Sequence, residues 1–91
     1  MLVVALFKVK AGTPEERMAR RLQWQYPPQG VKKIAEYWLQ TTDPAVIAVA
    51  EADSVAQMMA STAGWHDVFD ITIVPAVTAE EGLEIARRMQ A

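Results

Sequence analysis

Two segments of the chain are apolar at every position, and this feature constrains the fold more than any other. Residues 2–7 are Leu-Val-Val-Ala-Leu-Phe, and residues 45–50 are Ala-Val-Ile-Ala-Val-Ala. Because successive side chains of a strand point to opposite faces of a sheet, both faces of each segment would be apolar. The two segments are therefore predicted to be the central strands of one sheet.

Two further strand-like segments, residues 31–40 and 69–76, contain polar residues. The first carries Lys32, Lys33 and Glu36, and the second carries Asp70, Thr72 and Pro75. Charged residues and proline are typical of edge strands, where they discourage pairing with other chains. The two segments are predicted to border the central strands.

Three helices are predicted from cap signals and apolar spacing. Thr13-Pro14-Glu15-Glu16 combines an N-cap, a proline at the first helical position and a capping box, and Met18, Leu22 and Tyr26 follow as one stripe. Asp53 or Ser54 begins a second helix, with Val55, Met58, Met59 and Thr62 on one stripe. Thr78 begins a third helix that carries Leu83, Ile85, Ala86 and Met89.

The predicted order is β-α-β-β-α-β with an additional C-terminal helix. Right-handed crossovers then give an α+β, ferredoxin-like antiparallel sheet of order 4-1-3-2, with helices on one face. The length of 91 residues indicates one domain, residues 1–91.

The uncovered face of such a sheet predicts a homodimer. Four strands of about six residues present roughly 400 Å². At ~25 cal/mol/Å², burying this face yields on the order of 10 kcal/mol at most, against an association cost of ~4 to 15 kcal/mol. A stable pair would therefore need added contacts, from the terminal helix or an exchanged strand.

Composition argues against several classes of protein. A net charge of −2 is unlike the cationic surface of a nucleic-acid binder. With no cysteine and one histidine, no structural metal or cofactor is expected, and a cytoplasmic location fits. Residues 2–7 lack a basic lead-in and a cleavage site, so they are interpreted as a strand rather than a signal, and no membrane association is expected.

The order of several short motifs resembles the dimeric α+β barrel superfamily, and within it a family of short uncharacterised prokaryotic proteins. The motifs are Phe7-Lys8 through Gly12 and Glu16, Pro28-Gln29-Gly30, Val49-Ala50-Glu51-Ala52-Asp53, Trp65-His66-Asp67 and Ile73-Val74-Pro75. The resemblance implies two sheets packed face to face. Relatives include monooxygenases, isomerases, haem-degrading enzymes and proteins with no known activity. The haem-degrading relatives depend on an Asn, Trp and His set, and this sequence contains no asparagine.

His66 is the candidate catalytic residue because an imidazole titrates near neutral pH and no other histidine is present. The alternative is a histidine that makes only a backbone hydrogen bond. Trp65, Tyr37, Trp38 and Glu51 are candidate ligand-binding residues, and the alternatives are core or interface packing for the aromatic residues and a solvated strand end for Glu51.

Trp24 falls near Arg17, Arg20 and Arg21 on the helical wheel. This grouping is consistent with an anion or partner site, or with an exposed cation–π pair between Trp24 and Arg20.

The leading functional hypothesis is a homodimer that binds a small apolar or aromatic ligand, either between sheet and helices or inside the barrel, with no assignable activity. The alternatives are a cofactor-independent monooxygenase or isomerase that uses His66 as acid and base, and a structural assembly partner.

Overall fold

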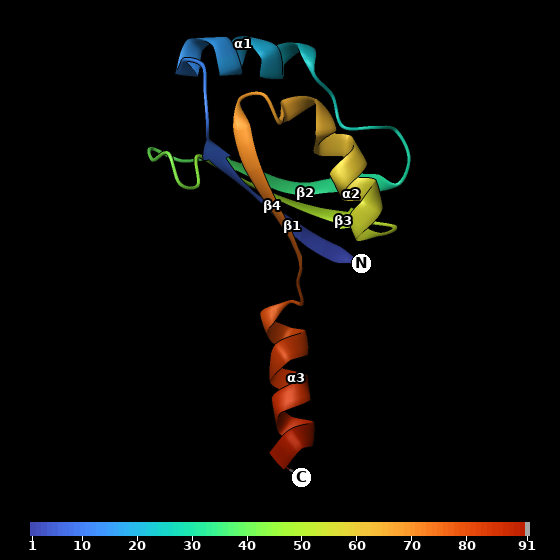
Figure 1. Cartoon of the computed structure of the whole chain (residues 1–91). Helices are drawn as coiled ribbons and strands as arrows, with labels where there is room; N and C mark the ends of the chain where they lie inside the picture. The colour runs from blue at the N-terminus through green and yellow to red at the C-terminus, as the bar shows by residue number, and fades with distance from the viewer. Residues whose placement is uncertain (91) are drawn as a thin grey trace.

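The computed structural model describes residues 1–90 and contains one four-stranded antiparallel sheet (Figure 1). The strands are β1 (Leu2–Val9), β2 (Val31–Trp38), β3 (Val46–Ala52) and β4 (Phe69–Pro75). The helices are α1 (Pro14–Gln23), α2 (Val55–Thr62) and α3 (Ala79–Gln90), and a short 3-10 turn, Ala63–Trp65, follows α2. Every predicted helix and strand is present.

The strand order is β2-β3-β1-β4, so the prediction that the two apolar segments are central is confirmed. Val4 of β1 lies opposite Val49 of β3 on one side and Val74 of β4 on the other. This order is compatible with a ferredoxin-like fold. In Figure 1, α1 and α2 lie on the same side of the sheet.

The core lies between the sheet and α2. Alternate residues of β1 point into it, and Val3 and Ala5 are fully buried there. The facing residues of β3 are Ala48, Ala50 and Ala52, whose small side chains let α2 approach the sheet closely. Met58 of α2 fills this space and is fully buried. The sequence pattern therefore identified the core, but Met59, on the same predicted stripe, is 57% exposed.

α1 forms as predicted but does not pack as predicted. Glu16 N donates to Thr13 Oγ1, and the Glu16 carboxylate accepts from Thr13 N, which completes the capping box. The helix ends at Gln23, so Tyr26 lies beyond it, and Leu22 is 81% exposed. The predicted stripe of Met18, Leu22 and Tyr26 is thus not a buried stripe, because α1 stands away from the sheet.

The opposite face of the sheet is apolar and is not covered by any helix of the described chain. Its central residues are Leu2, Val4, Leu6, Ile47 and Val49, all half-buried. We call this surface the open face. Glu51, predicted at the end of a strand, lies within β3 and pairs with Leu2.

α3 projects away from the rest of the molecule (Figure 1). None of its residues is buried. Within residues 1–90, no helix is long and apolar enough to cross a membrane.

Candidate functional site

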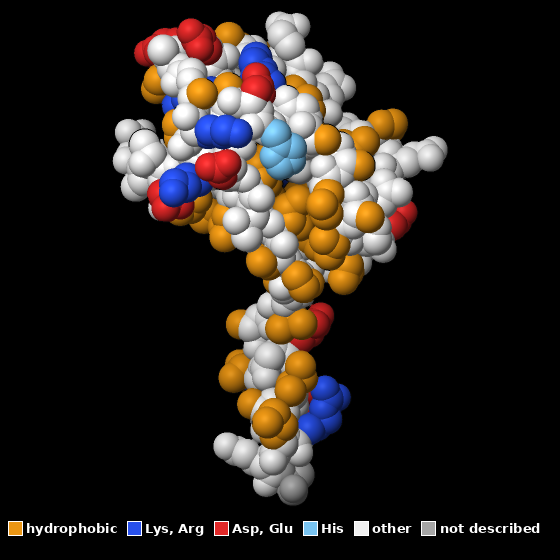
Figure 2. Space-filling model, in the orientation of Figure 1, with side chains coloured by type: hydrophobic (Ala, Val, Ile, Leu, Met, Phe, Trp, Pro, Cys, Tyr) orange, Lys and Arg blue, Asp and Glu red, His pale blue; other side chains and the backbone are white. Residues whose placement is uncertain are grey.

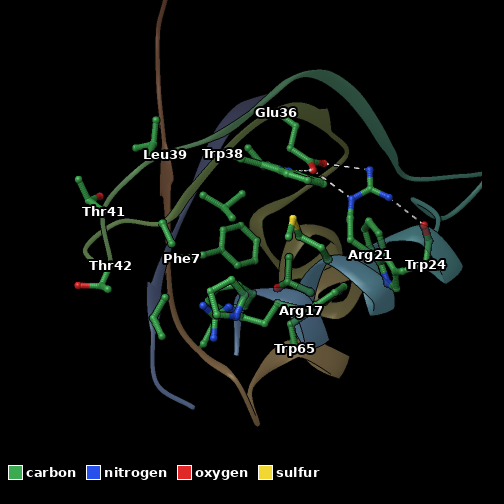
Figure 3. A pocket seen from close by; sticks show the side chains of 18 of the residues that line it. Phe7, Arg17, Arg21, Trp24, Glu36, Trp38, Leu39, Thr41, Thr42 and Trp65 are labelled. Atoms are coloured by element: carbon green, nitrogen blue, oxygen red, sulfur yellow. Dashed lines mark hydrogen bonds and ion pairs between the residues drawn. The ribbon is translucent and has the colours of Figure 1, made fainter. Parts of the chain in front are cut away.

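A cavity of about 450 Å³ lies between α1 and the helix-covered face of the sheet (Figure 3). From α1 it is lined by Pro14, Arg17, Met18 and Arg21, and from the sheet by Phe7, Glu36, Trp38, Val46, Ala48 and Phe69. The cavity exists because α1 sends no side chain into the core. Met58 of α2, which is fully buried, also lines it.

Aromatic rings in edge-to-face and tilted contact form one wall of the cavity. Trp24 lies 4.7 Å from Tyr26 and 6.1 Å from Trp65, measured between ring centroids. Trp65 in turn lies 5.9 Å from Phe69, which meets Phe7 at 5.3 Å. These contacts fix the rings, so the wall is preformed.

A hydrogen-bonded cluster centred on Glu36 borders the aromatic wall. Oε1 accepts from the Tyr26 hydroxyl at 2.7 Å and from Arg21 Nη2 at 3.1 Å. Oε2 accepts from Arg21 Nε at 3.0 Å and from Trp38 Nε1 at 2.6 Å. Both carboxylate oxygens are thus occupied by the protein itself, so Glu36 serves as an anchor rather than a free base.

The ionisation of this cluster follows from its contacts. Burial acts to raise the pKa of Glu36, but hydrogen bonds from Arg21, Trp38 and Tyr26 together outweigh it and lower that pKa. The hydrogen bond to Glu36 raises the pKa of Arg21. Burial, with the same carboxylate nearby, raises the pKa of Tyr26. At neutral pH the cluster is therefore an ion pair with a neutral phenol.

Arg17 is the second cation on the cavity wall. Its Nη1 donates to the carbonyl oxygens of Ala11 and Gly12 at 3.0 and 2.7 Å. The guanidinium carbon lies 5.8 Å from the centre of the Phe69 ring. Two carbonyls and one ring thus hold the charge in a defined place.

Arg20 connects α1 to the segment after α2. It donates to Asp67 Oδ2 at 2.8 Å and to the Gly64 carbonyl oxygen at 2.7 Å, and its guanidinium carbon stacks 4.6 Å from the Trp65 ring. The expected pair of Arg20 with Trp24 is therefore wrong, because Arg21 is the cation that stacks on Trp24, at 5.3 Å. The hydrogen bond from Arg20 lowers the pKa of Asp67.

A family model described as a domain of unknown function (DUF3303) matches residues 1–90. The chain belongs to this family. No curated protein and no solved structure matches it at a significant level. The DUF3303 family therefore places the chain among proteins to which no activity can be assigned.

Of the ligand-binding residues predicted from the sequence of this DUF3303 domain, some line the cavity and others lie away from it. Trp38 and Trp65 line the cavity. Tyr37, whose neighbours in β2 point the other way, is opposite Ile47 on the open face and is 57% exposed. Glu51 lies 2.8 Å from the α-amino group of Met1, also away from the cavity.

His66 lies outside the main cavity, on the molecular surface (Figure 2). It borders a smaller hollow of about 180 Å³ between α2 and β4, with Met59 and Ile71 among its neighbours. Its backbone carbonyl oxygen accepts from Lys10 Nζ at 3.4 Å. A catalytic role for His66 stays a prediction. Among residues 1–90, no group of three or more potential ligands is arranged to hold a metal ion.

The sequence analysis placed Arg21 in a candidate anion or partner site with Trp24, but it missed Glu36 and did not assign Tyr26 to a site. Glu36 was interpreted only as an edge-strand charge. A usable signal was present, since Glu36 and Trp38 are two residues apart and so share one face of β2, the face that the helices cover. A carboxylate on a covered face requires partners, and the arginines of α1, the helix that precedes β2, are candidates.

Proposed function

We propose that this DUF3303 domain is a homodimer that binds a small apolar or aromatic molecule in the cavity beneath α1. The observation that carries the proposal is the cavity itself. Its volume, about 450 Å³, falls in the range of small-molecule sites, and its lining combines fixed aromatic rings and other apolar side chains with a smaller set of polar groups. The Glu36 cluster needs no ligand to satisfy it, so the ligand is held mainly by apolar contact.

The dimer would form through the open face, as in a dimeric α+β barrel. The support is that Val4, Leu6 and Val49 lie at the centre of a surface that no helix of the described chain covers. A contiguous apolar surface of this kind marks an interaction site. Pairing it with the same surface of a second copy would give a self-complementary interface.

Native mass spectrometry of freshly purified protein tests both parts of the proposal. The expected spectrum shows a dimer that carries added mass, which leaves on denaturation. In Val46→Trp, the larger side chain would fill part of the cavity, so the added mass should fall while the dimer remains. Ala56→Trp, at an exposed position of α2 outside the cavity lining, is the control and should keep both.

Leu6→Glu tests the interface alone, since it places a charge at the centre of the open face. Light scattering should then report a monomer. A monomeric mass for the unaltered protein would falsify the dimer, and a cavity that retains and takes up no small molecule would remove the binding function.

A further inference from the structure

The cavity carries a positive charge that its own residues do not neutralise. Arg21 and Glu36 form a matched ion pair at 3.0 Å. Arg17 donates only through Nη1, to two backbone carbonyls, and within residues 1–90 no carboxylate lies within ion-pair distance of it. Its Nε and Nη2 groups therefore keep their hydrogen-bonding capacity.

The position of Arg17 makes this charge available to a bound molecule. Arg17 lines the cavity together with the aromatic wall (Figure 3). The two carbonyl contacts and the Phe69 ring hold the guanidinium in place before any ligand arrives, which reduces the entropy lost on binding. A planar guanidinium with free donors is suited to a carboxylate or a similar anion.

We infer that the cavity ligand is an organic anion with an apolar or aromatic body, and that Arg17 binds its anionic group. This inference rests on the proposed binding function and names its ligand class. The rings of Trp24 and Trp65 would contact the body, while Arg17 would select against a neutral molecule of the same shape.

A matched pair of probes tests this inference: 3-phenylpropanoate and the neutral 3-phenyl-1-propanol. All three tryptophans of the chain line the cavity, so intrinsic fluorescence reports binding directly. The acid should bind more tightly than the alcohol by about tenfold, the discrimination expected of a charge-assisted hydrogen bond. Its affinity should fall with added salt, whereas that of the alcohol should not.

Arg17→Gln should remove the preference for the acid and leave the affinity for the alcohol nearly unchanged. Arg17→Lys retains the positive charge and should keep part of the preference for the acid. This result would show that Arg17→Gln acts through the lost charge and not through a displaced α1. Arg88→Gln on the remote α3 is the control for net charge. Equal binding of both probes by the unaltered protein would overturn this inference alone. Binding of neither probe would count against the proposed function as well.

A second inference comes independently from α3. Thr78 Oγ1 accepts from Glu81 N at 3.1 Å, acidic residues occupy the first turn and basic residues the last, so the helix is encoded locally. An isolated helix of this length is nevertheless marginal in water. None of its residues is buried, so packing its apolar side chains on another surface would stabilise it.

The side chains of α3 are sorted by type around the helix. Its charged residues, Glu80, Glu81, Glu84, Arg87 and Arg88, fall on one side at 100° per residue. Leu83, Ile85 and Met89 occupy the rest of the circumference and are all exposed. Figure 2 shows hydrophobic side chains along the length of this helix.

The open face alone is smaller than a stable dimer interface, and α3 would supply part of the missing area if it packed on a second copy. A stable interface buries about 800 Å² on each partner, whereas the open face offers roughly 400 Å². In a symmetric pair each copy would bury one face of a helix ~18 Å long and ~10 Å wide, roughly 180 Å², and a similar area beneath the partner's helix, which brings the total on each copy to roughly 760 Å². The chain reaches α3 from the border of the open face, where Ala76 N donates to the Leu2 carbonyl oxygen at 2.9 Å, and the helix then leads away from its own sheet (Figure 1).

We propose that α3 packs its apolar face on a second copy of this chain and so extends the interface made by the open face. Amide hydrogen exchange distinguishes this from packing on its own sheet. Protection of residues 79–90 should rise with protein concentration in parallel with dimer formation. Protection that is independent of concentration, or no protection in the dimer, would overturn the proposal.

The double substitution Leu83→Glu with Ile85→Glu should weaken dimerisation by about tenfold or more, measured by sedimentation equilibrium. Arg88→Glu changes the net charge by the same amount on the charged side and should have little effect. If Leu6→Glu dissociates the dimer and the α3 variant does not, the open-face dimer stands and the role of α3 is refuted.

Discussion

α1 and α2 cover the same face of one sheet by different means. α2 buries Met58 and Thr62 directly against the strands. α1 buries none of its residues and is instead held by Arg20 and Arg21, which reach Trp65, Asp67 and Glu36. Direct packing of α2 fills the space against the sheet, whereas α1, held at a distance by long polar side chains, leaves a cavity beneath it.

The largest effect is expected on the α2 side, where Met58→Ala would remove a fully buried side chain. The free energy of unfolding should fall by about 3 kcal/mol, from lost burial and the cavity that remains. Chemical denaturation measures this change. Met59→Ala is the control on the same helix and should cost less than about 0.5 kcal/mol, since Met59 is 57% exposed. Similar losses for both would contradict the packing of α2.

Glu36→Gln should produce the largest effect on the α1 side. The amide cannot accept both hydrogen bonds from Arg21 and leaves that partly buried cation without its counter-charge. We expect a loss of about 2 kcal/mol in the free energy of unfolding, together with a change in tryptophan emission because Trp38 Nε1 loses its charged acceptor. Unchanged emission would mean that the cluster does not hold the cavity wall.

The pH dependence of stability provides a separate check on Glu36. Its pKa is lowered in the folded state, so its contribution is present above the unfolded value of about 4.3 and is lost as pH falls through the folded value. Unfolding curves between neutral and acidic pH should therefore show a smaller loss of stability on acidification in Glu36→Gln than in the unaltered protein. Equal slopes would show that Glu36 does not contribute in this range.

A smaller effect is expected for Arg20→Gln, which removes the link from α1 to Trp65 and Asp67. Because the side chain of Arg20 is 42% exposed, the cost should be about 1 kcal/mol. Hydrogen exchange in α1 should increase while α2 remains protected. An equal increase in both helices would show that the two are not held independently.

The smallest effect is expected for Leu22→Ala. Leu22 is 81% exposed on α1, so the free energy of unfolding should change by less than about 0.5 kcal/mol. Differential scanning calorimetry in dilute protein should show nearly the same midpoint. A larger loss would mean that α1 packs more closely in solution than its arginine contacts imply.

The helices, the strands and the strand order could be predicted from the sequence because their causes are local. Thr13, Ser54 and Thr78 cap their helices through neighbouring backbone amides. The apolar residues 2–7 and 45–50 could only be central strands, since both faces of each required cover from water. Of the two caps predicted for α2, Asp53 and Ser54, the structure uses Ser54, whose Oγ accepts from Gln57 N.

The cavity could not be predicted from the sequence, because it depends on contacts between residues far apart in the chain. Whether Leu22 is buried depends on how far α1 lies from the sheet, and that distance is set by Arg21 meeting Glu36 and by Arg20 meeting Asp67, 47 positions apart in the chain. Neither hydrophobic periodicity nor helix-cap signals predict such pairings between distant residues. Trp24 and Trp65 likewise meet only after folding. The sequence alone therefore determined the framework, because backbone pairing and burial follow local pattern. The site depended on long-range side-chain contacts, which are made only when the framework brings distant residues together.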